Sequence, residues 1–148
     1  MADCRPMSTP MITNWKKLHA LESSLVDPTL YRQLIGSLMY LVNTRRDICF
    51  AVNTLTQFMV ECRKVHWVAA KHILRYVHGT VDYGLDYRRG DGVRLAGYTG
   101  SDWAGCASDR KITSGCCFGL GSIVVSWFSR KQKSVALSFF EAEYMAAS

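Results

Sequence analysis

The sequence lacks any long run of apolar residues. No stretch approaches the roughly 18 consecutive apolar residues that a membrane-spanning helix needs. The first ten residues, MADCRPMSTP, carry no apolar segment of the length found in secretory signal peptides. We therefore expect no membrane span. The residues by themselves favour a cytoplasmic or nuclear protein, unless export is signalled in another way.

The cysteines lack the spacing of a zinc site. Six are scattered along the chain, and none forms a C-x-x-C pair. His66, His72 and His78 have no cysteine or acid at useful ligand spacing. We expect no bound metal, and reduced thiols are favoured over disulfides.

Acidic residues are in deficit. The 148 residues include 12 Asp or Glu and 18 Lys or Arg, which gives a formal charge of +6. A basic balance indicates attraction to phosphate backbones or anionic surfaces, although it does not identify the partner. Hydrophobic residues make up 49% of the chain, which is typical of a folded core and argues against disorder.

Only three prolines occur, and two of them lie within residues 1–26, which show no sustained periodicity. This stretch is predicted to be an extended arm. Asp27 and Pro28 then mark a helix start, because Asp accepts hydrogen bonds from the first turn and Pro fits its first position. Asp47 is predicted to open a second helix. Residues 64–78 are predicted to form a third, which Gly79 ends.

The apolar faces of these helices follow from a 3.6-residue period. They comprise Tyr31, Leu34, Ile35, Leu38, Met39 and Val42 in the first helix, Ile48, Ala51, Val52, Leu55, Phe58 and Met59 in the second, and Trp67, Ala70, Leu74 and Val77 in the third.

After residue 81 the period changes to two. Alternation begins at Tyr83 and continues through residue 99 around a turn at 89–92, and a second hairpin is predicted between strands near 112–118 and 123–128. Residues 141–148 should begin a helix. The predicted fold is α+β, with an arm at 1–26, a helical region at 27–80, and an antiparallel three-stranded sheet with the start of one helix at 81–148.

Basic residues gather in three places. Lys71 and Arg75 lie on neighbouring turns of the third helix, where they could contact duplex phosphates or form an ordinary solvated face. Two further clusters adjoin the strands, where they could give weak, salt-sensitive affinity for nucleic acid. The predicted nucleic-acid contacts are Lys71, Arg75, Arg110, Lys111, Arg130, Lys131 and Lys133.

Several ordered motifs resemble a known family. Residues 98–105, YTGSDWAG, are similar to Y-[ST]-D-x-D-W-A-G, and residues 136–145, ALSFFEAEYM, are similar to A-L-S-[ST]-T-E-A-E-Y-M. Residues 31–48 match Y-R-x-L-[IV]-G-S-L-M-Y-L-x-x-T-R-x-D-I. Together they resemble the end of the reverse transcriptase and a truncated RNase H domain in Ty1/copia retrotransposon Pol polyproteins.

That resemblance implies a nuclease site in which carboxylates hold Mg²⁺. Gly100 stands where the family has its first metal-binding Asp, and Glu143 matches the second acid. The remaining family acids belong to segments beyond residue 148. Asp102 lies two residues along a strand from position 100, roughly 6.6 Å away, too far to replace a direct ligand. We expect a vestigial Glu143, an incomplete Mg²⁺ site, no cofactor and no enzymatic activity.

Two interpretations stay open. One is an inactive retrotransposon remnant with weak binding of nucleic acid or an RNA–DNA hybrid. The other rests on a resemblance to copia-like chains among oomycete RxLR effectors, which are secreted, enter plant cells and suppress cell death. The candidate translocation motif is Arg32, Gln33, Leu34 and Ile35, with Ile35 in place of the second arginine. That resemblance implies secretion, action in the host nucleus or cytoplasm, and an unknown host protein as partner.

Overall fold

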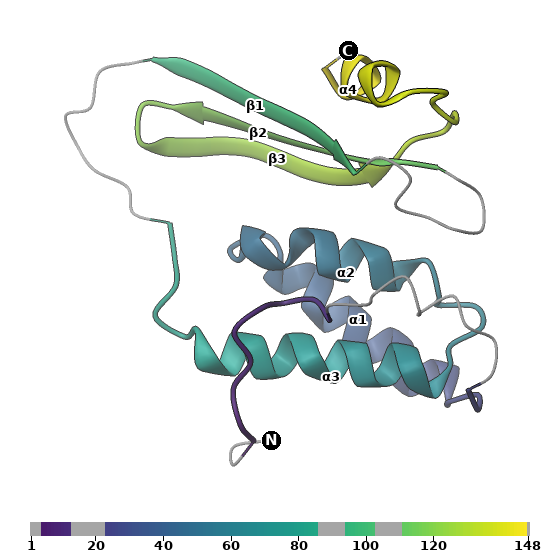
Figure 1. Ribbon diagram of the computed structural model, residues 1–148. Coiled ribbons are helices and arrows are strands. Elements are labelled where there is room, and N and C mark those ends of the chain that lie inside the picture. The colour runs from purple at the N-terminus through teal and green to yellow at the C-terminus, as the bar shows by residue number, and fades with distance from the viewer. Residues whose placement is uncertain (1–3, 13–22, 86–93, 103–110, 148) are drawn as a thin grey trace. The chain divides into compact units, whose positions relative to one another are not determined.

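The computed structural model describes residues 4–12, 23–85, 94–102 and 111–147. They belong to two compact units, residues 1–84 and 85–148. The fold is α+β, as predicted: the first unit is helical, and the second holds a three-stranded antiparallel sheet and a final helix (Figure 1). The finer division at residues 26 and 80 remains a prediction.

Helix α1 (Pro28–Leu41) begins where the sequence predicts. The Asp27 carboxylate accepts a hydrogen bond from the Thr29 amide at 2.8 Å, and Pro28 occupies the first helical position. The helix buries Tyr31, Ile35 and Leu38. Their spacing places position 39 on the side of the helix, so the prediction that Met39 lies in the core is wrong: 50% of it is exposed.

A short 3-10 turn, η2 (Arg46–Ile48), leads into helix α2 (Cys49–Thr56). The apolar face predicted for α2 is confirmed by the burial of Ile48, Ala51, Val52 and Leu55. The Tyr31 hydroxyl donates to the Leu55 carbonyl at 2.9 Å, which ties α1 to α2, and burial raises the pKa of this tyrosine.

Helix α3 (Lys64–Gly79) closes the helical core. Its most buried residues are His66, Ala69, Ala70, Ile73 and Tyr76. Of the predicted face, Ala70 is confirmed as fully buried, and Trp67, Leu74 and Val77 pack against the core but are only partly buried. The prediction missed His66, Ala69, Ile73 and Tyr76, which form the centre of the buried face.

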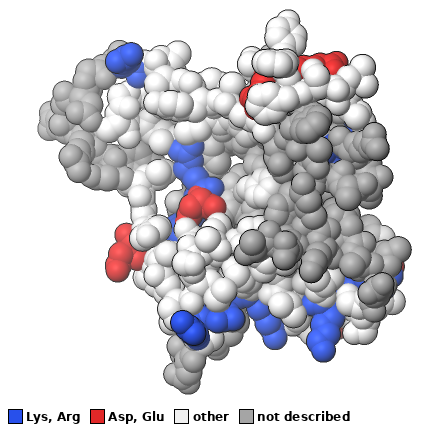
Figure 2. All heavy atoms as spheres, in the orientation of Figure 1, with Lys and Arg blue, Asp and Glu red and all other residues white. Residues whose placement is uncertain are grey.

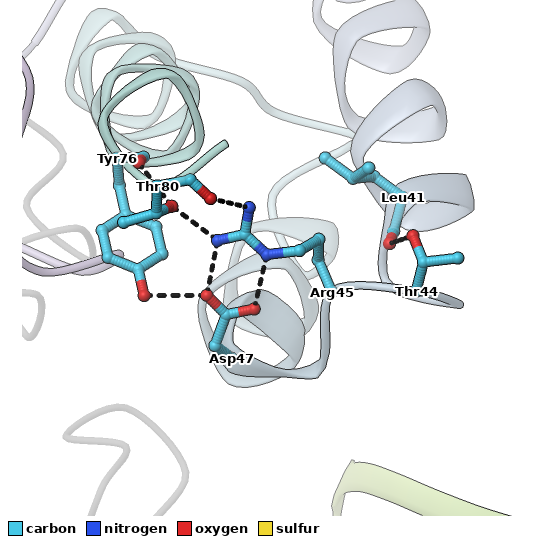
Figure 3. A network of polar contacts seen from close by, with 6 residues as sticks. All are labelled: Leu41, Thr44, Arg45, Asp47, Tyr76 and Thr80. Carbon is cyan, nitrogen blue, oxygen red and sulfur yellow. Dashed lines mark hydrogen bonds and ion pairs between the residues drawn. The ribbon is translucent and has the colours of Figure 1, made fainter. Parts of the chain in front are cut away.

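A buried guanidinium links the start of η2 to the end of α3 (Figure 3). Arg45 donates to both carboxylate oxygens of Asp47, at 3.0 and 2.7 Å, and to the carbonyl and hydroxyl of Thr80, at 2.8 and 2.6 Å. The Tyr76 hydroxyl donates to Asp47 at 2.7 Å. Asp47 thus lies at the start of the second helical segment, as predicted, and its carboxylate is engaged by these two donors.

The second unit consists of β1 (Leu95–Asp102), β2 (Thr113–Leu120), β3 (Ile123–Lys131) and α4 (Phe139–Ala147). The predicted hairpin between β2 and β3 is confirmed, and its turn contains Gly121 at φ 60°, a conformation that suits glycine. Residues 83–85 are not in a strand, which contradicts the predicted alternation from Tyr83; this ring lies 5.8 Å from the Arg45 guanidinium instead. The predicted turn at 89–92 lies outside the described residues.

Helix α4 covers one end of one sheet face (Figure 1). Ala142 packs with Ile112 and Ala136 in the small core of this unit. The helix starts two residues earlier than predicted, with the Ser138 hydroxyl accepting from the Glu141 amide at 3.2 Å. Phe139 and Phe140 do not pack over the sheet: they contact each other edge to face and stay exposed. None of the helices in the described ranges is long and apolar enough to cross a membrane.

The Arg45–Asp47 ion pair predicts that removing the charge of Asp47 lowers the stability of the helical unit. Asp47→Asn should lower the free energy of unfolding of the helical unit by about 3 kcal/mol, because Arg45 keeps its charge in a buried site without its counterion. Denaturant unfolding followed by helix circular dichroism measures this. Asp82→Asn, at an exposed position of the same unit, is the matched control.

The same pair predicts a pH dependence. The hydrogen bond from Arg45, and then that from Tyr76, holds the pKa of Asp47 below its usual range. Its stabilisation is therefore complete above about pH 4, the ordinary Asp pKa, and is lost as the pH falls through the lowered value. Asp47→Asn should abolish this part of the acid destabilisation. Equal acid sensitivity in both proteins would contradict the role of the pair.

Candidate functional site

Glu143, the acid that matches the nuclease motif, lies on α4 where this helix contacts β1. The Glu143 carboxylate accepts two hydrogen bonds from Ser101, at 3.1 Å from its amide and 2.8 Å from its hydroxyl. One turn further along α4, the Ala146 carbonyl accepts from the Thr99 hydroxyl at 2.7 Å. The side chains at positions 99 and 101 therefore face α4.

Gly100 lies between them, so any side chain at this position would project from the opposite face of the strand. A Cβ built on Gly100 meets no atom within 4 Å, which shows that a larger residue has space there. In this structure, however, a carboxylate at position 100 would point away from Glu143.

These residues do not fit a Mg²⁺ site. Mg²⁺ prefers several oxygen ligands in octahedral geometry, whereas one Glu143 oxygen already accepts two hydrogen bonds from Ser101. Among the residues described, no three His, Cys, Asp or Glu side chains are grouped so that they could hold a metal ion.

The predicted basic residues of the second unit gather at the same end of the sheet. Thr113 pairs with Asp102 on one side and with Lys131 on the other. The end of β1, the start of β2 and the end of β3 therefore lie at the same end of the sheet. Lys111 precedes the first residue of β2 and Lys133 follows the last residue of β3. Arg130 is exposed near the end of β3. We call Lys111, Arg130, Lys131 and Lys133 the sheet-end cluster. Arg110 lies outside the described residues.

The predicted basic residues of the first unit lie on α3. Figure 2 shows Lys and Arg gathered along the face of the unit that carries this helix. Lys71 is exposed, with its ammonium 5.4 Å from the centre of the Trp67 ring. Arg75 lies one turn further, but its Nε donates to the backbone carbonyl of Arg5 at 2.7 Å. The sequence carried no clear signal of this contact, since it joins residues 70 positions apart.

The candidate translocation motif lies in the first half of α1. Arg32 and Gln33 are exposed, and Arg32 Nε donates to the Met59 carbonyl at 3.1 Å. Leu34 packs against the core and Ile35 is fully buried. This tetrapeptide therefore forms part of a folded helix.

The buried histidine is structural in its contacts. His66 accepts a hydrogen bond from the Arg63 amide through Nδ1 at 2.9 Å, and its ring stacks on Phe58 with centroids 4.0 Å apart. The interaction closes the first turn of α3. It is a helix cap that the spacing of the residues could have indicated, because position 66 is the third residue of the helix.

Comparison with known proteins supplies relatives over almost the whole chain. The retrovirus-related Pol polyprotein from transposon RE2 of Arabidopsis thaliana is 43% identical over 144 residues, which cover 97% of this chain and 10% of that polyprotein. The corresponding polyprotein from transposon TNT 1-94 of Nicotiana tabacum is 39% identical over 154 residues, 99% of this chain and 12% of its own length. This chain thus spans about a tenth of the Pol polyproteins that it matches.

A much shorter protein is also similar. Secreted RxLR effector protein 161 of Plasmopara viticola is 46% identical over 119 residues, which cover 80% of this chain and 84% of that protein. No family model matches the chain, and no solved structure does.

Proposed function

Because this chain belongs to the Pol polyprotein family of copia-type retrotransposons, we propose that it is a catalytically inactive Pol-derived protein that binds the backbone of nucleic acid weakly. The observation that carries the inactivity is Gly100. Glycine supplies no ligand where the family motif has an acid, and Glu143 is held by Ser101. The chain's own residues therefore provide positive charge for binding without the set of carboxylates that metal-assisted hydrolysis needs.

The sheet-end cluster supports the binding part of the proposal. Strand pairing brings Lys111 near the end of β3, so four cations from two segments lie at the same end of the sheet. Phosphate contacts of this kind depend on charge and spacing, and they do not require base recognition. The excess of Lys and Arg over Asp and Glu adds a favourable long-range field. The expected ligand is a duplex, such as an RNA–DNA hybrid, held without sequence preference.

Salt dependence tests this binding surface. Replacing two exposed cations of the sheet-end cluster, as in the double variant Arg130→Gln with Lys133→Gln, should weaken binding of a labelled RNA–DNA hybrid. The plot of log affinity against log salt should become shallower by about 1.8, since each lost phosphate contact contributes roughly 0.9. Fluorescence anisotropy across a salt series measures both quantities.

The matched control is Arg94→Gln, which removes an exposed arginine at the opposite end of the sheet, just before β1. For each charge removed, it should change the slope much less than the double variant. An equal change of slope per charge removed in the two proteins would mean that binding reflects net charge alone, and the sheet-end cluster would no longer be the proposed site.

A second candidate function is that of a secreted effector acting inside plant cells. It is favoured by the similarity to Secreted RxLR effector protein 161, most of whose length this chain covers. In this role the protein would be exported, reach the host cytoplasm or nucleus, and suppress cell death by binding a host protein. Arg32 and Gln33 are the exposed members of its candidate translocation motif. Here the folded surface, not a nuclease reaction, would carry the activity.

Expression inside plant cells challenged with a cell-death inducer tests the effector role. Gly36→Pro should abolish suppression, because proline in the interior of α1 removes a backbone hydrogen bond and costs about 3 kcal/mol. Gly36→Ala is the matched control at the same position, where an added Cβ meets no atom within 4 Å, and it should retain suppression. Absence of suppression by the native chain, at a protein level equal to that of the control, would exclude this candidate.

A further inference from the structure

Residues 4–12, which we call the N-terminal strap, lie against α3 (Figure 1). The Met7 amide donates to the Arg75 carbonyl at 3.4 Å, and the Met7 and Met11 side chains pack on the helical core. Pro6 lies against Gly79 at the last turn of the helix, so closely that a Cβ on Gly79 would be 2.5 Å from the Pro6 Cβ. The strap thus follows α3 from its end toward its middle.

The strap occupies the donors of the basic side of α3. Arg75 Nε lies 2.7 Å from the carbonyl oxygen of Arg5, and His72 Nε2 lies 2.9 Å from that of Thr9. Together with the exposed Lys71, these two side chains form what we call the α3 ridge. Two of the three ridge side chains are therefore directed at strap carbonyls.

A phosphate would compete with the strap for these donors. A carbonyl oxygen is a neutral acceptor, whereas a phosphate oxygen is charged, and charge-assisted hydrogen bonds are roughly twice as strong as neutral ones. The planar guanidinium of Arg75 can also donate to two phosphate oxygens at once, whereas a carbonyl group offers it only one oxygen. The strap itself is held near Arg75 by a long backbone bond of 3.4 Å and has exposed residues at positions 5, 6, 8 and 9. A stronger hydrogen-bond acceptor could therefore displace the strap.

We propose that the N-terminal strap is an autoinhibitory segment that masks the α3 ridge, and that its displacement strengthens the binding of a nucleic-acid backbone. The inference rests on the proposed function, because it concerns how the same protein regulates its phosphate contacts. With the strap closed, the sheet-end cluster carries the binding. With the strap displaced, Arg75 and His72 join Lys71 to form a second contact surface.

Gly79→Ala opens the strap without altering any charge. The new methyl group collides with the Pro6 ring, while alanine favours the helix that it completes. Amide hydrogen exchange of residues 4–12 should become faster. The affinity for a labelled RNA–DNA hybrid at low salt should rise severalfold, with a log–log salt slope steeper by about 0.9 for the gain of one phosphate contact. Gly36→Ala, the same substitution in an open part of α1, should change neither measurement.

Two further variants separate unmasking from general loosening of the fold. Arg75→Gln in the Gly79→Ala background should return the affinity to that of the native chain. Met7→Ser with Met11→Ser, which removes the apolar anchors of the strap, should reproduce the steeper slope. Faster exchange of the strap with native affinity in both opened proteins would overturn the inference and leave the proposed function intact. No binding by the native chain or by either opened variant would overturn both.

Discussion

A buried positive charge is the constraint on which the helical unit depends. Arg45 is 8% exposed and lies where three segments meet: its own turn, the first residues of η2 and the end of α3. An unpaired guanidinium in such a place would cost several kcal/mol. Asp47 and Thr80 must therefore be positioned to accept its hydrogen bonds. That requirement fixes the end of α3, and with it the place of Tyr76 and the close approach of the strap at Gly79.

The two units contribute differently to the proposed function. In the sheet unit, strand pairing collects cations at the end of the sheet where Ser101 of β1 contacts Glu143 of α4. In the proposal, Gly100 supplies no ligand at this end. In the helical unit, the cations of α3 are partly occupied by the chain's own backbone. The proposed function accordingly keeps a surface that attracts phosphate and omits the cleavage of a phosphodiester. Binding needs only charge at suitable spacing, whereas metal-assisted hydrolysis needs several carboxylates aimed at one point.

Local chemistry explains which elements could be predicted from the sequence. The start of α1 follows from Asp27 and Pro28, and the β2–β3 hairpin follows from alternation around Gly121, because both depend on residues close in the chain. The Arg45–Thr80 contact joins residues 35 positions apart and depends on how the helices pack, so no local pattern announces it. The centre of the buried face of α3 was missed for a related reason. His66 and Tyr76 contribute polar atoms to hydrogen bonds and rings to the core, so hydrophobicity alone identified Ala70 and the margin of the buried face but not its centre.

The most direct measurement is the fate of a labelled RNA–DNA hybrid incubated with the purified chain and Mg²⁺. Anisotropy reports binding, and gel analysis of the same sample reports cleavage of the RNA strand. Gly100 and the Ser101-bound carboxylate of Glu143 predict salt-sensitive binding with no cleavage above the protein-free control. Cleavage of the RNA strand that is abolished by Glu143→Gln would contradict the proposal of an inactive, phosphate-binding Pol fragment.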